Sequence, residues 1–453
     1  MSNSSQRLWG LRVAESFLLA WRALLRGHVL TALLALTALA HLLLPAIVRS
    51  DGTAAGGREL FLRVVPGSVY MVLCVALLAC ACGLVARARE SHRLSLAVVR
   101  PVSAGVIVLG PFLALVAVAA IVLAFNAGLT CARGGWTGSR HVYAPALEPP
   151  EVAARQMLQE LLADTNTPQE VRSVPRHRLL AILVGRESDR YETIPPGGGI
   201  EWPFPAEAAA APGGVVARIR FSTQFNLRSS LSGVVTFGQW SASVSNCTQS
   251  ILEIPLAVAT SCDPPGAVAT SCDPPGAVAT SCDPPEAGGP KLAFRNTGKS
   301  TVMLRPRRDV EILTPAGSFG MNMLRTSGEM LCVVAFLCAF GLFLSSALSR
   351  PVAIFSALVM LVVTEMAPAV VAQCPDALDM PMTDRIGLWI SRAVVYATSA
   401  MAETEPISEL ATGTYVEWSR LGRAFLVDAV AAPLVLLAFA AFLVRRRASA
   451  SRG

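Results

Sequence analysis

Two acidic residues lie inside apolar stretches that are long enough to span a membrane. Glu365 falls within residues 351–372, and Asp428 falls within residues 424–444. An ionisable side chain in lipid is costly, so it usually marks an ion path, a proton relay or a substrate cavity. These intramembrane acids are thus candidate site residues, and one interpretation is that they face each other across a water-filled cleft. The favoured interpretation is that both reach the outer membrane interface and are merely hydrated.

Other patterns for nucleotide binding or catalysis are incomplete. Residues 297–300 read Thr-Gly-Lys-Ser, like the end of a phosphate-binding loop, but Ala293 stands where the leading glycine belongs. The five histidines are scattered, and no pair has the spacing of metal ligands. We therefore predict that the chain is not an enzyme, has no catalytic residues and carries no cofactor or metal.

The composition excludes an ordinary soluble protein. Of the 453 residues, 53% are hydrophobic and 15% are charged, and the mean hydropathy is +0.52. Soluble domains carry about 25% charged residues. Disorder is excluded too, because it requires low hydrophobicity. The net charge of +7 follows membrane topology, as shown below, so the predicted partner is the lipid membrane and not nucleic acid.

Six stretches are long and apolar enough to be transmembrane helices, because a hydrocarbon core of about 30 Å requires about 20 apolar residues. They are residues 29–48, 68–86, 104–125, 330–349, 351–372 and 424–444. We thus predict a polytopic α-helical membrane protein. Its domains are spans 1–3 within 29–126, spans 4–5 within 328–372, and span 6 with a basic tail within 424–453.

Arginines collect at every second connection between these spans. Residues 1–28 contain four arginines and one glutamate, as do residues 87–103, and the tail 445–453 contains four arginines. By contrast, segment 127–329 contains 18 basic and 18 acidic residues, and loop 373–423 has a net charge of −3. This positive-inside pattern predicts a multi-pass protein of the cytoplasmic (inner) membrane with both termini in the cytoplasm. The long middle segment and loop 373–423, with its amphipathic helix, are then extracytoplasmic.

The segment before the first span is amphipathic. Leu11, Leu18, Trp21 and Leu25 recur at helical spacing, and arginines occupy the polar positions between them. Residues 1–28 are therefore predicted to form an elbow helix in the cytoplasmic interface, with tryptophan at headgroup depth. The alternative is a simple helical extension of the first span.

Residues 127–327 are numerous enough for one sizeable domain. A helix is predicted over residues 150–164. Alternating apolar residues predict short strands over residues 179–184, 214–222, 233–244, 292–295, 302–305 and 310–313. Short strands punctuated by Pro and Gly favour an antiparallel β-sandwich. The fold class therefore includes an extracytoplasmic α+β insert, mainly β-sandwich, between spans three and four.

A ten-residue unit occurs three times in tandem over residues 257–286. It contains Asp-Pro-Pro and little that could be buried, which is typical of a duplicated surface loop and not of a solenoid. A metal site made by Cys262, Cys272 and Cys282 is the alternative. Structural zinc ligands usually have closer spacing, so a surface loop is favoured.

Three sets of residues near the predicted membrane surfaces carry a family resemblance. The first set is residues 88–94 with 99–103, an acidic–basic helix followed by Arg-Pro-Val-Ser. The second is residues 313–320, which lead into residues 338–353. The third is residues 416–423, which enter the last span. Together with the elbow helix, they resemble the permease subunit of a type-2 ABC exporter, in the branch linked to multi-copper-enzyme maturation. At one point the chain departs from this family: Pro111 follows Gly110 where a lysine is common, which predicts a kink in span three.

The resemblance implies a transmembrane permease subunit of an ABC-type exporter that hydrolyses nothing itself. Its cytoplasmic loop 87–103 would dock on a separate ATP-binding cassette subunit that powers transport. The implied coupling contacts are Arg89, Glu90, Arg93 and Arg100. The resemblance also implies a homodimer or a pair with a related permease. Two alternatives are a non-transporting membrane sensor or scaffold that displays the β-domain, and an intramembrane enzyme built on the two acids.

Overall fold

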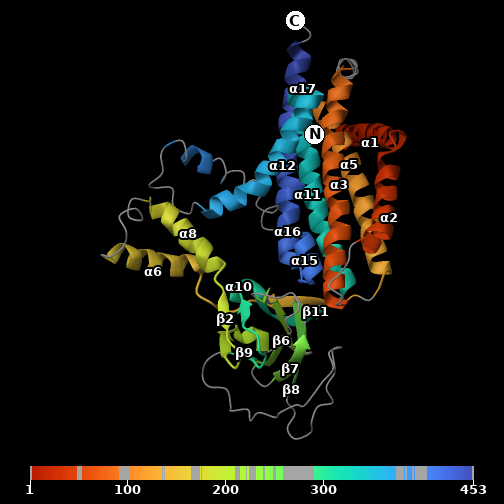
Figure 1. Cartoon of the computed structure of the whole chain (residues 1–453). Helices are drawn as coiled ribbons and strands as arrows, with labels where there is room; N and C mark the ends of the chain where they lie inside the picture. Colours follow the sequence, from red (N-terminus) through yellow and green to blue (C-terminus); the bar gives the residue numbers. More distant parts are fainter. Residues whose placement is uncertain are drawn as a thin grey trace.

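The computed structural model consists of a bundle of long helices with antiparallel sheets at one end (Figure 1). It describes residues 3–47, 54–90, 103–134, 136, 138–164, 174, 176–209, 215–220, 222–223, 231–237, 240–247, 251–258, 290–373, 382, 385–389, 392 and 406–450. Of the decapeptide repeats, only Ala257 and Val258 fall within these residues, at the end of a strand. Cys262, Cys272 and Cys282 lie outside them.

Five helices of the described chain are long and apolar enough to cross a membrane. Four are α2 (Val29–Ile47), α3 (Ala54–Glu90), α5 (Ala104–Ala132) and α11 (Phe319–Ala347). The fifth is continuous through α16 (Trp418–Ala424), the π-helix η1 (Phe425–Ala431) and α17 (Ala432–Ala450). These helices indicate a membrane protein, as the composition predicted.

The remaining predicted span, residues 351–372, forms helix α12 (Arg350–Gln373). The apolar part of α12 whose side chains are described, Arg350–Val363, is 14 residues long. A bilayer requires about 20 residues, so the structure supports five spans and the sixth stays a prediction.

The centre of the bundle is formed by α3, α5 and α11. Leu73, Leu77, Leu115 and Val334 from these helices are fully buried in one apolar core. The helices approach closely where small residues meet: a Cβ added at Gly341 of α11 would lie 2.7 Å from the Cβ of Ala81. Small residues permit such close packing between membrane helices.

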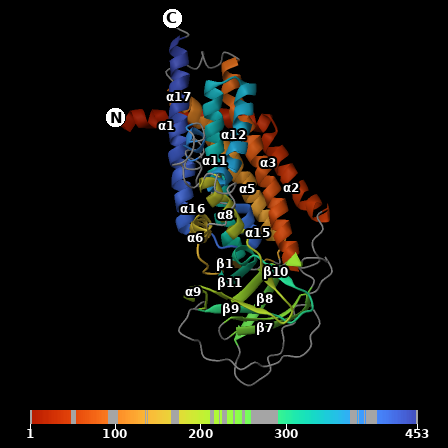
Figure 2. The same cartoon turned by 60° about the vertical axis from the view of Figure 1, so that its left-hand side comes forward.

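Helix α1 (Asn3–Arg26) runs across the bundle and does not extend α2 (Figures 1 and 2). Gly27 and His28 form the turn between the two helices, and His28 has a φ of 54°. Helix α1 packs on α5 so closely that a Cβ added at Gly110 would lie 2.7 Å from the carbonyl carbon of Ser16. Helix α5 continues through Pro111 without interruption.

The segment between α5 and α11 contains two antiparallel sheets. Their strands are β1 (Ser139–Tyr143), β2 (Glu192–Ile194), β3 (Gly199–Pro203), β4 (Val215–Arg220), β5 (Ser222–Thr223), β6 (Leu231–Phe237), β7 (Trp240–Cys247), β8 (Ile251–Val258), β9 (Lys291–Asn296), β10 (Val302–Leu304) and β11 (Val310–Gly317). The larger sheet has the order β1-β11-β4-β8-β7-β6-β9-β3, and the smaller has the order β2-β10-β5.

A single apolar core joins both sheets. Trp202, Phe237 and Phe294 come from the larger sheet, and Ile194 and Leu304 come from the smaller. The β-rich insert between α5 and α11 is therefore present. The face-to-face packing of a β-sandwich stays a prediction.

The strand predicted over residues 179–184 is wrong, because this segment belongs to helix α8 (Arg176–Ser188). Leu180 and Leu183, one helical turn apart, pack around Ala154 of helix α6 (Pro150–Ala163). A short run of apolar residues is compatible with a strand or a buried helix. The tertiary partner α6 decided between them. The other short helices are α9 (Ala206–Ala209), α10 (Pro306–Asp309) and α15 (Pro406–Thr412).

Both ends of the described chain lie toward the end of the bundle that is remote from the sheets (Figures 1 and 2). The C-terminal end of α3 and the start of α12 lie at this remote end too. The sheets are at the opposite end, so the bundle separates the termini from the β-rich insert. This arrangement agrees with the alternation of arginine-rich connections along the sequence.

Candidate functional site

Among the predicted site residues, Asp428 alone has a described side chain. The others lie outside the described side chains: Arg89, Glu90, Arg93, Arg100 and Glu365. The pairing of Asp428 with Glu365 therefore stays a prediction, as do the four coupling contacts. Asp428 lies in η1, and the helix that packs against η1, α11, carries a second buried acid, Glu329.

Asp428 is buried in the π-helix η1. It is 1% exposed, and neither of its carboxylate oxygens hydrogen-bonds to a described residue. Its neighbours Phe425 and Leu426 are 54% and 63% exposed, so the turn directs these apolar side chains outward and Asp428 inward. Single π-helical turns within α-helices occur frequently at functional sites.

Glu329 and Cys332 lie one turn apart on α11, which packs against η1. Glu329 is 1% exposed. Cys332 is buried as well, at 4% exposed. The two buried acids therefore lie on helices that pack against each other.

One guanidinium connects Glu329 to a second acid. Arg420 Nε lies 3.1 Å from Glu329 Oε1. Its two Nη atoms donate to the two carboxylate oxygens of Glu409, at 2.7 and 2.8 Å. Bidentate arginine–carboxylate pairs are among the strongest hydrogen-bonded contacts. Arg420 therefore ties α15 and α16 to the buried face of α11.

The segment between α15 and α16, residues 412–418, is bound along α11, and we call it the strap. The Asn322 amide donates to the Thr414 carbonyl at 2.8 Å and accepts from the Val416 N–H at 2.9 Å. Arg325 Nη1 donates to the Val416 carbonyl at 3.0 Å. The Arg325 guanidinium also lies over the rings of Tyr415 and Trp418, at 4.5 and 4.7 Å from their centroids.

The strap also binds the larger sheet. The Arg140 N–H of β1 donates to the Gly413 carbonyl, and the Tyr415 N–H donates to the Arg140 carbonyl, each at 2.9 Å. Arg218 Nη2 of β4 donates to the Thr412 carbonyl at 2.8 Å. The strap is therefore a direct mechanical link between the sheet and α11.

Arg218 is the centre of a charged network on the sheet side of the strap. It is 5% exposed and lies 2.9 Å from Glu253 and 3.3 Å from Glu311. Arg140 pairs with the other oxygen of Glu253, also at 2.9 Å. Because Arg218 contacts both acids and the strap, it couples three neighbouring strands, β4, β8 and β11, to the bundle.

The charged network has a predicted pH dependence. Burial raises the pKa of Glu253, but the guanidiniums of Arg218 and Arg140 outweigh it and hold that pKa below the ordinary value of 4.5. The stabilisation from ionised Glu253 is therefore complete above pH 4.5 and is lost as the pH falls through the lower folded-state pKa.

We expect Glu253→Gln to lower the thermal unfolding temperature at neutral pH, with the difference from wild type shrinking as the pH falls below the ordinary pKa of glutamate. Thermal unfolding in lipid nanodiscs at a series of pH values measures this. The exposed Glu207 of α9 provides the matched control, Glu207→Gln, which should have little effect. A difference for Glu253→Gln that persists unchanged in acid would contradict the prediction.

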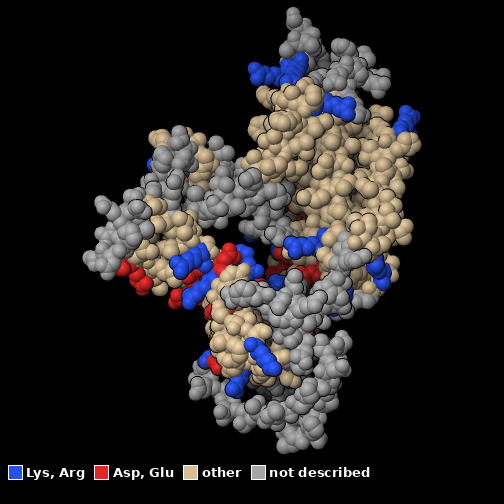
Figure 3. Space-filling view, viewed as in Figure 1, with Lys and Arg blue, Asp and Glu red and all other residues tan. Residues whose placement is uncertain are grey.

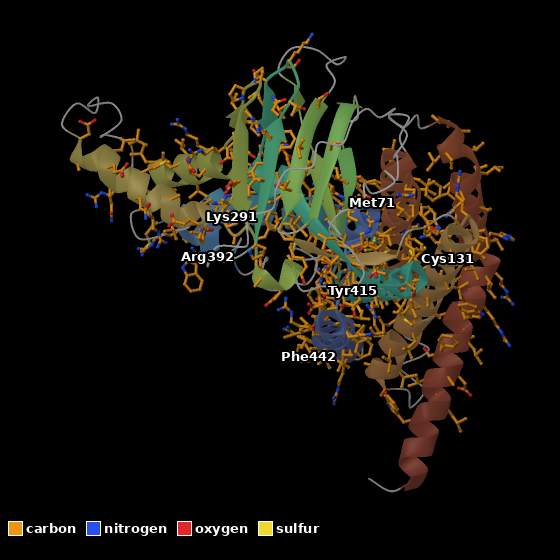
Figure 4. All side chains as sticks on the ribbon, turned by 90° about the horizontal axis from the view of Figure 1, so that it is seen from below. Met71, Cys131, Lys291, Arg392, Tyr415 and Phe442 are labelled. Carbon is orange, nitrogen blue, oxygen red and sulfur yellow. The ribbon has the colours of Figure 1, made fainter. Side chains whose placement is uncertain are left out.

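Charged side chains are distributed unevenly over the surface of the protein. Acidic and basic side chains concentrate between the bundle and the sheets, and the visible flank of the bundle is almost free of them (Figure 3). Seen from the sheet side, Tyr415 lies between the strands and the last helix, which Phe442 marks (Figure 4). The candidate site is thus the polar junction between an apolar bundle and a β-rich insert.

Sequence reasoning missed most of this junction. It began the fourth span at residue 330, whereas helix α11 begins at Phe319 and includes Glu329. The signal was present in residues 322–329, which mix polar and apolar side chains directly before an apolar stretch and can therefore continue the same helix. Arg420 was noticed only within a family-like segment, and its pairing with Glu409 could not be inferred from spacing.

No known protein family, curated protein or solved structure matches this chain. Within the described residues, no group of three or more His, Cys, Asp and Glu side chains is arranged to bind a metal ion. The chemistry that the junction offers is therefore ion pairing, hydrogen bonding and proton exchange at buried acids.

Proposed function

We propose that this chain is the transmembrane permease subunit of an ABC-type exporter, powered by a separate ATPase subunit. The observation that carries the proposal is the amphipathic helix α1, which crosses the bundle and packs on α5 through Gly110. An elbow helix of this kind precedes the first span in the family that the sequence resembles. Helix α3 ends at the remote end of the bundle, where a cytoplasmic partner would dock.

The proposed topology has six spans, with α12 as the fifth, and both termini in the cytoplasm of a bacterial cell. The arginine-rich connections support it, because basic residues are retained on the cytoplasmic side. In this topology the sheets are extracytoplasmic, and the strap couples them to α11. A homodimer, or a pair with a related permease, would complete the transport path.

Cysteine labelling provides a test of the topology. Single reporter cysteines placed near residues 200 and 400, in a chain whose native cysteines are replaced, should react with an impermeant maleimide in intact cells. A cysteine at position 95 should react only after the membrane is permeabilised. Labelling of position 95 in intact cells would overturn the topology.

The partner is tested by reversing charge in the proposed docking loop. We expect Arg89→Glu combined with Arg93→Glu to abolish co-purification of the ATPase, because like charges brought together at an interface cost several kcal/mol. The measurement is an affinity pull-down from detergent-solubilised native membranes, followed by identification of the bound proteins.

The matched control is Arg445→Glu combined with Arg446→Glu, which reverses the same number of charges on the exposed part of α17. This control should still recover the ATPase. If the docking-loop variant recovered as much ATPase as wild type, the coupling role proposed for Arg89 and Arg93 would be wrong. Failure of wild type to recover any ATP-binding cassette protein would contradict the permease proposal.

A sensor or scaffold is the second candidate function, and the strap favours it. A signal from a ligand on the sheets requires a rigid connection to the bundle, and the strap contacts both Arg218 and Asn322. This candidate predicts a folded, abundant protein that recovers no ATPase and is indifferent to changes in residues 87–103.

A further inference from the structure

The buried acids beside η1 outnumber the arginines that contact them. Arg420 is shared between Glu329 and Glu409, so this group of three has a net charge of −1 when both acids are ionised. Asp428 adds a further negative charge with no hydrogen bond to a described residue. Arg423 acts on Asp428 only through space, from an exposed position.

Arg325, one helical turn before Glu329 on α11, already has other partners. Arg325 is hydrogen-bonded to the Val416 carbonyl and lies over two aromatic rings. The titratable and charged groups around the two acids are therefore Cys332 on α11, Glu409 on α15, and Arg420 and Arg423 on α16. None of the described groups supplies a direct counter-charge to Asp428.

An ionised carboxylate without a hydrogen-bond partner in an apolar interior is very costly. Such a site is stabilised by a cationic ligand. The proton requires the fewest ligand atoms, and it forms an O–H bond to a carboxylate oxygen and cancels one negative charge. In a membrane bundle, buried acids of this kind commonly belong to proton-binding sites.

We propose that Asp428 and Glu329 form a proton-binding site inside the bundle, where η1 packs on α11. The proton comes from water and forms an O–H bond to one of these two buried carboxylates, each of which is 1% exposed. The site differs from the cleft predicted between Asp428 and Glu365, because its second acid is on α11. The inference is independent of the proposed transport function, since it rests only on the burial, contacts and charges of these side chains.

The site has a direct connection to the strap. A proton on Glu329 removes the charge that attracts Arg420, so Arg420 is left paired with Glu409 alone. The contact between α16 and α11 is then weakened, while the contact between α15 and α16 is kept. Proton binding at this site therefore changes how the strap is attached to the bundle.

Infrared spectroscopy of the full-length protein in lipid nanodiscs tests the proposal. A protonated carboxyl group has a carbonyl stretching band that an ionised carboxylate lacks, and the band shifts on exchange into heavy water. We expect wild type to show such a band at neutral pH and Asp428→Asn to lose all or part of it. Asp428→Glu should retain a band at a shifted frequency, and Glu329→Gln should change its intensity.

The matched control is Glu151→Gln, which removes an exposed acid on α6 and should leave the band unchanged. Absence of the band in folded wild type, from mildly acidic to mildly alkaline pH, would overturn the proposal. The proposal would also be overturned if Asp428→Asn and Glu329→Gln both kept a carbonyl band as intense as that of wild type. If sodium or potassium at constant pH removed the band and raised the unfolding temperature, the ligand would be a metal cation and the proton-site proposal would be wrong.

Discussion

Arg218→Met is expected to lower the free energy of unfolding by about 3 kcal/mol, because removal of one partner from a buried ion pair leaves an uncompensated charge. Glu253 and Glu311 would both lose a guanidinium, and the strap would lose its hydrogen bond at the Thr412 carbonyl. This expected loss is at the lower end of the range for breaking a buried ion pair, because Glu253 and Glu311 are 19% and 18% exposed. The measurement is denaturant unfolding in nanodiscs, followed by tryptophan fluorescence.

Two further variants distinguish the ion network from general damage to the sheet. Arg295→Met changes an exposed arginine on β9 and should alter stability by less than about 0.5 kcal/mol. Adding Glu253→Gln to Arg218→Met should restore part of the loss, because the stranded charge is removed with its partner. Equal losses for Arg218→Met and Arg295→Met would contradict the role assigned to Arg218.

Gly110→Val is expected to detach α1 from α5. The new Cβ would lie 2.7 Å from a backbone carbon at Ser16, so the whole of α1 must move, and not just a flexible side chain. Overpacking of this kind typically costs about 1–3 kcal/mol. Hydrogen–deuterium exchange by mass spectrometry should show faster exchange over residues 11–26 in the variant.

Gly128→Val is the matched control on the same helix. A Cβ added at Gly128 meets nothing within 4 Å, so exchange in α1 should stay at the wild-type rate. The two variants have similar intrinsic effects on helix propensity, and their difference isolates the contact with α1. Protection of α1 that is unchanged in Gly110→Val would mean that its packing does not depend on this close approach.

Much of the bundle was predictable from local patterns. Stretches of apolar residues fold as helices in lipid because every backbone N–H and C=O must be bonded within the segment. The predicted stretches 29–48, 68–86 and 104–125 therefore correspond to α2, α3 and α5. The separate helix α1 was also predictable, since its arginines and leucines alternate at helical spacing.

The insert was only partly predictable. Alternating residues identified β4, β9, β10 and β11, because one face of an antiparallel strand is buried and the other is not. The run at 179–184 was predicted as a strand with them, but it is helical because α6 lies beside it. Local periodicity contains no information about such a partner.

The sequence by itself determined that the chain is a membrane protein, where most of its apolar helices lie and that Asp428 sits in an apolar surrounding. These properties depend on neighbours along the chain, since hydrophobic burial and helix formation act over short ranges. Only the tertiary structure decided which side chains meet. Arg218, Glu253 and the strap are far apart in sequence, as are Glu329 and Arg420, and folding alone brings them into contact. Their ion pairs and the exclusion of water around them arise from that packing.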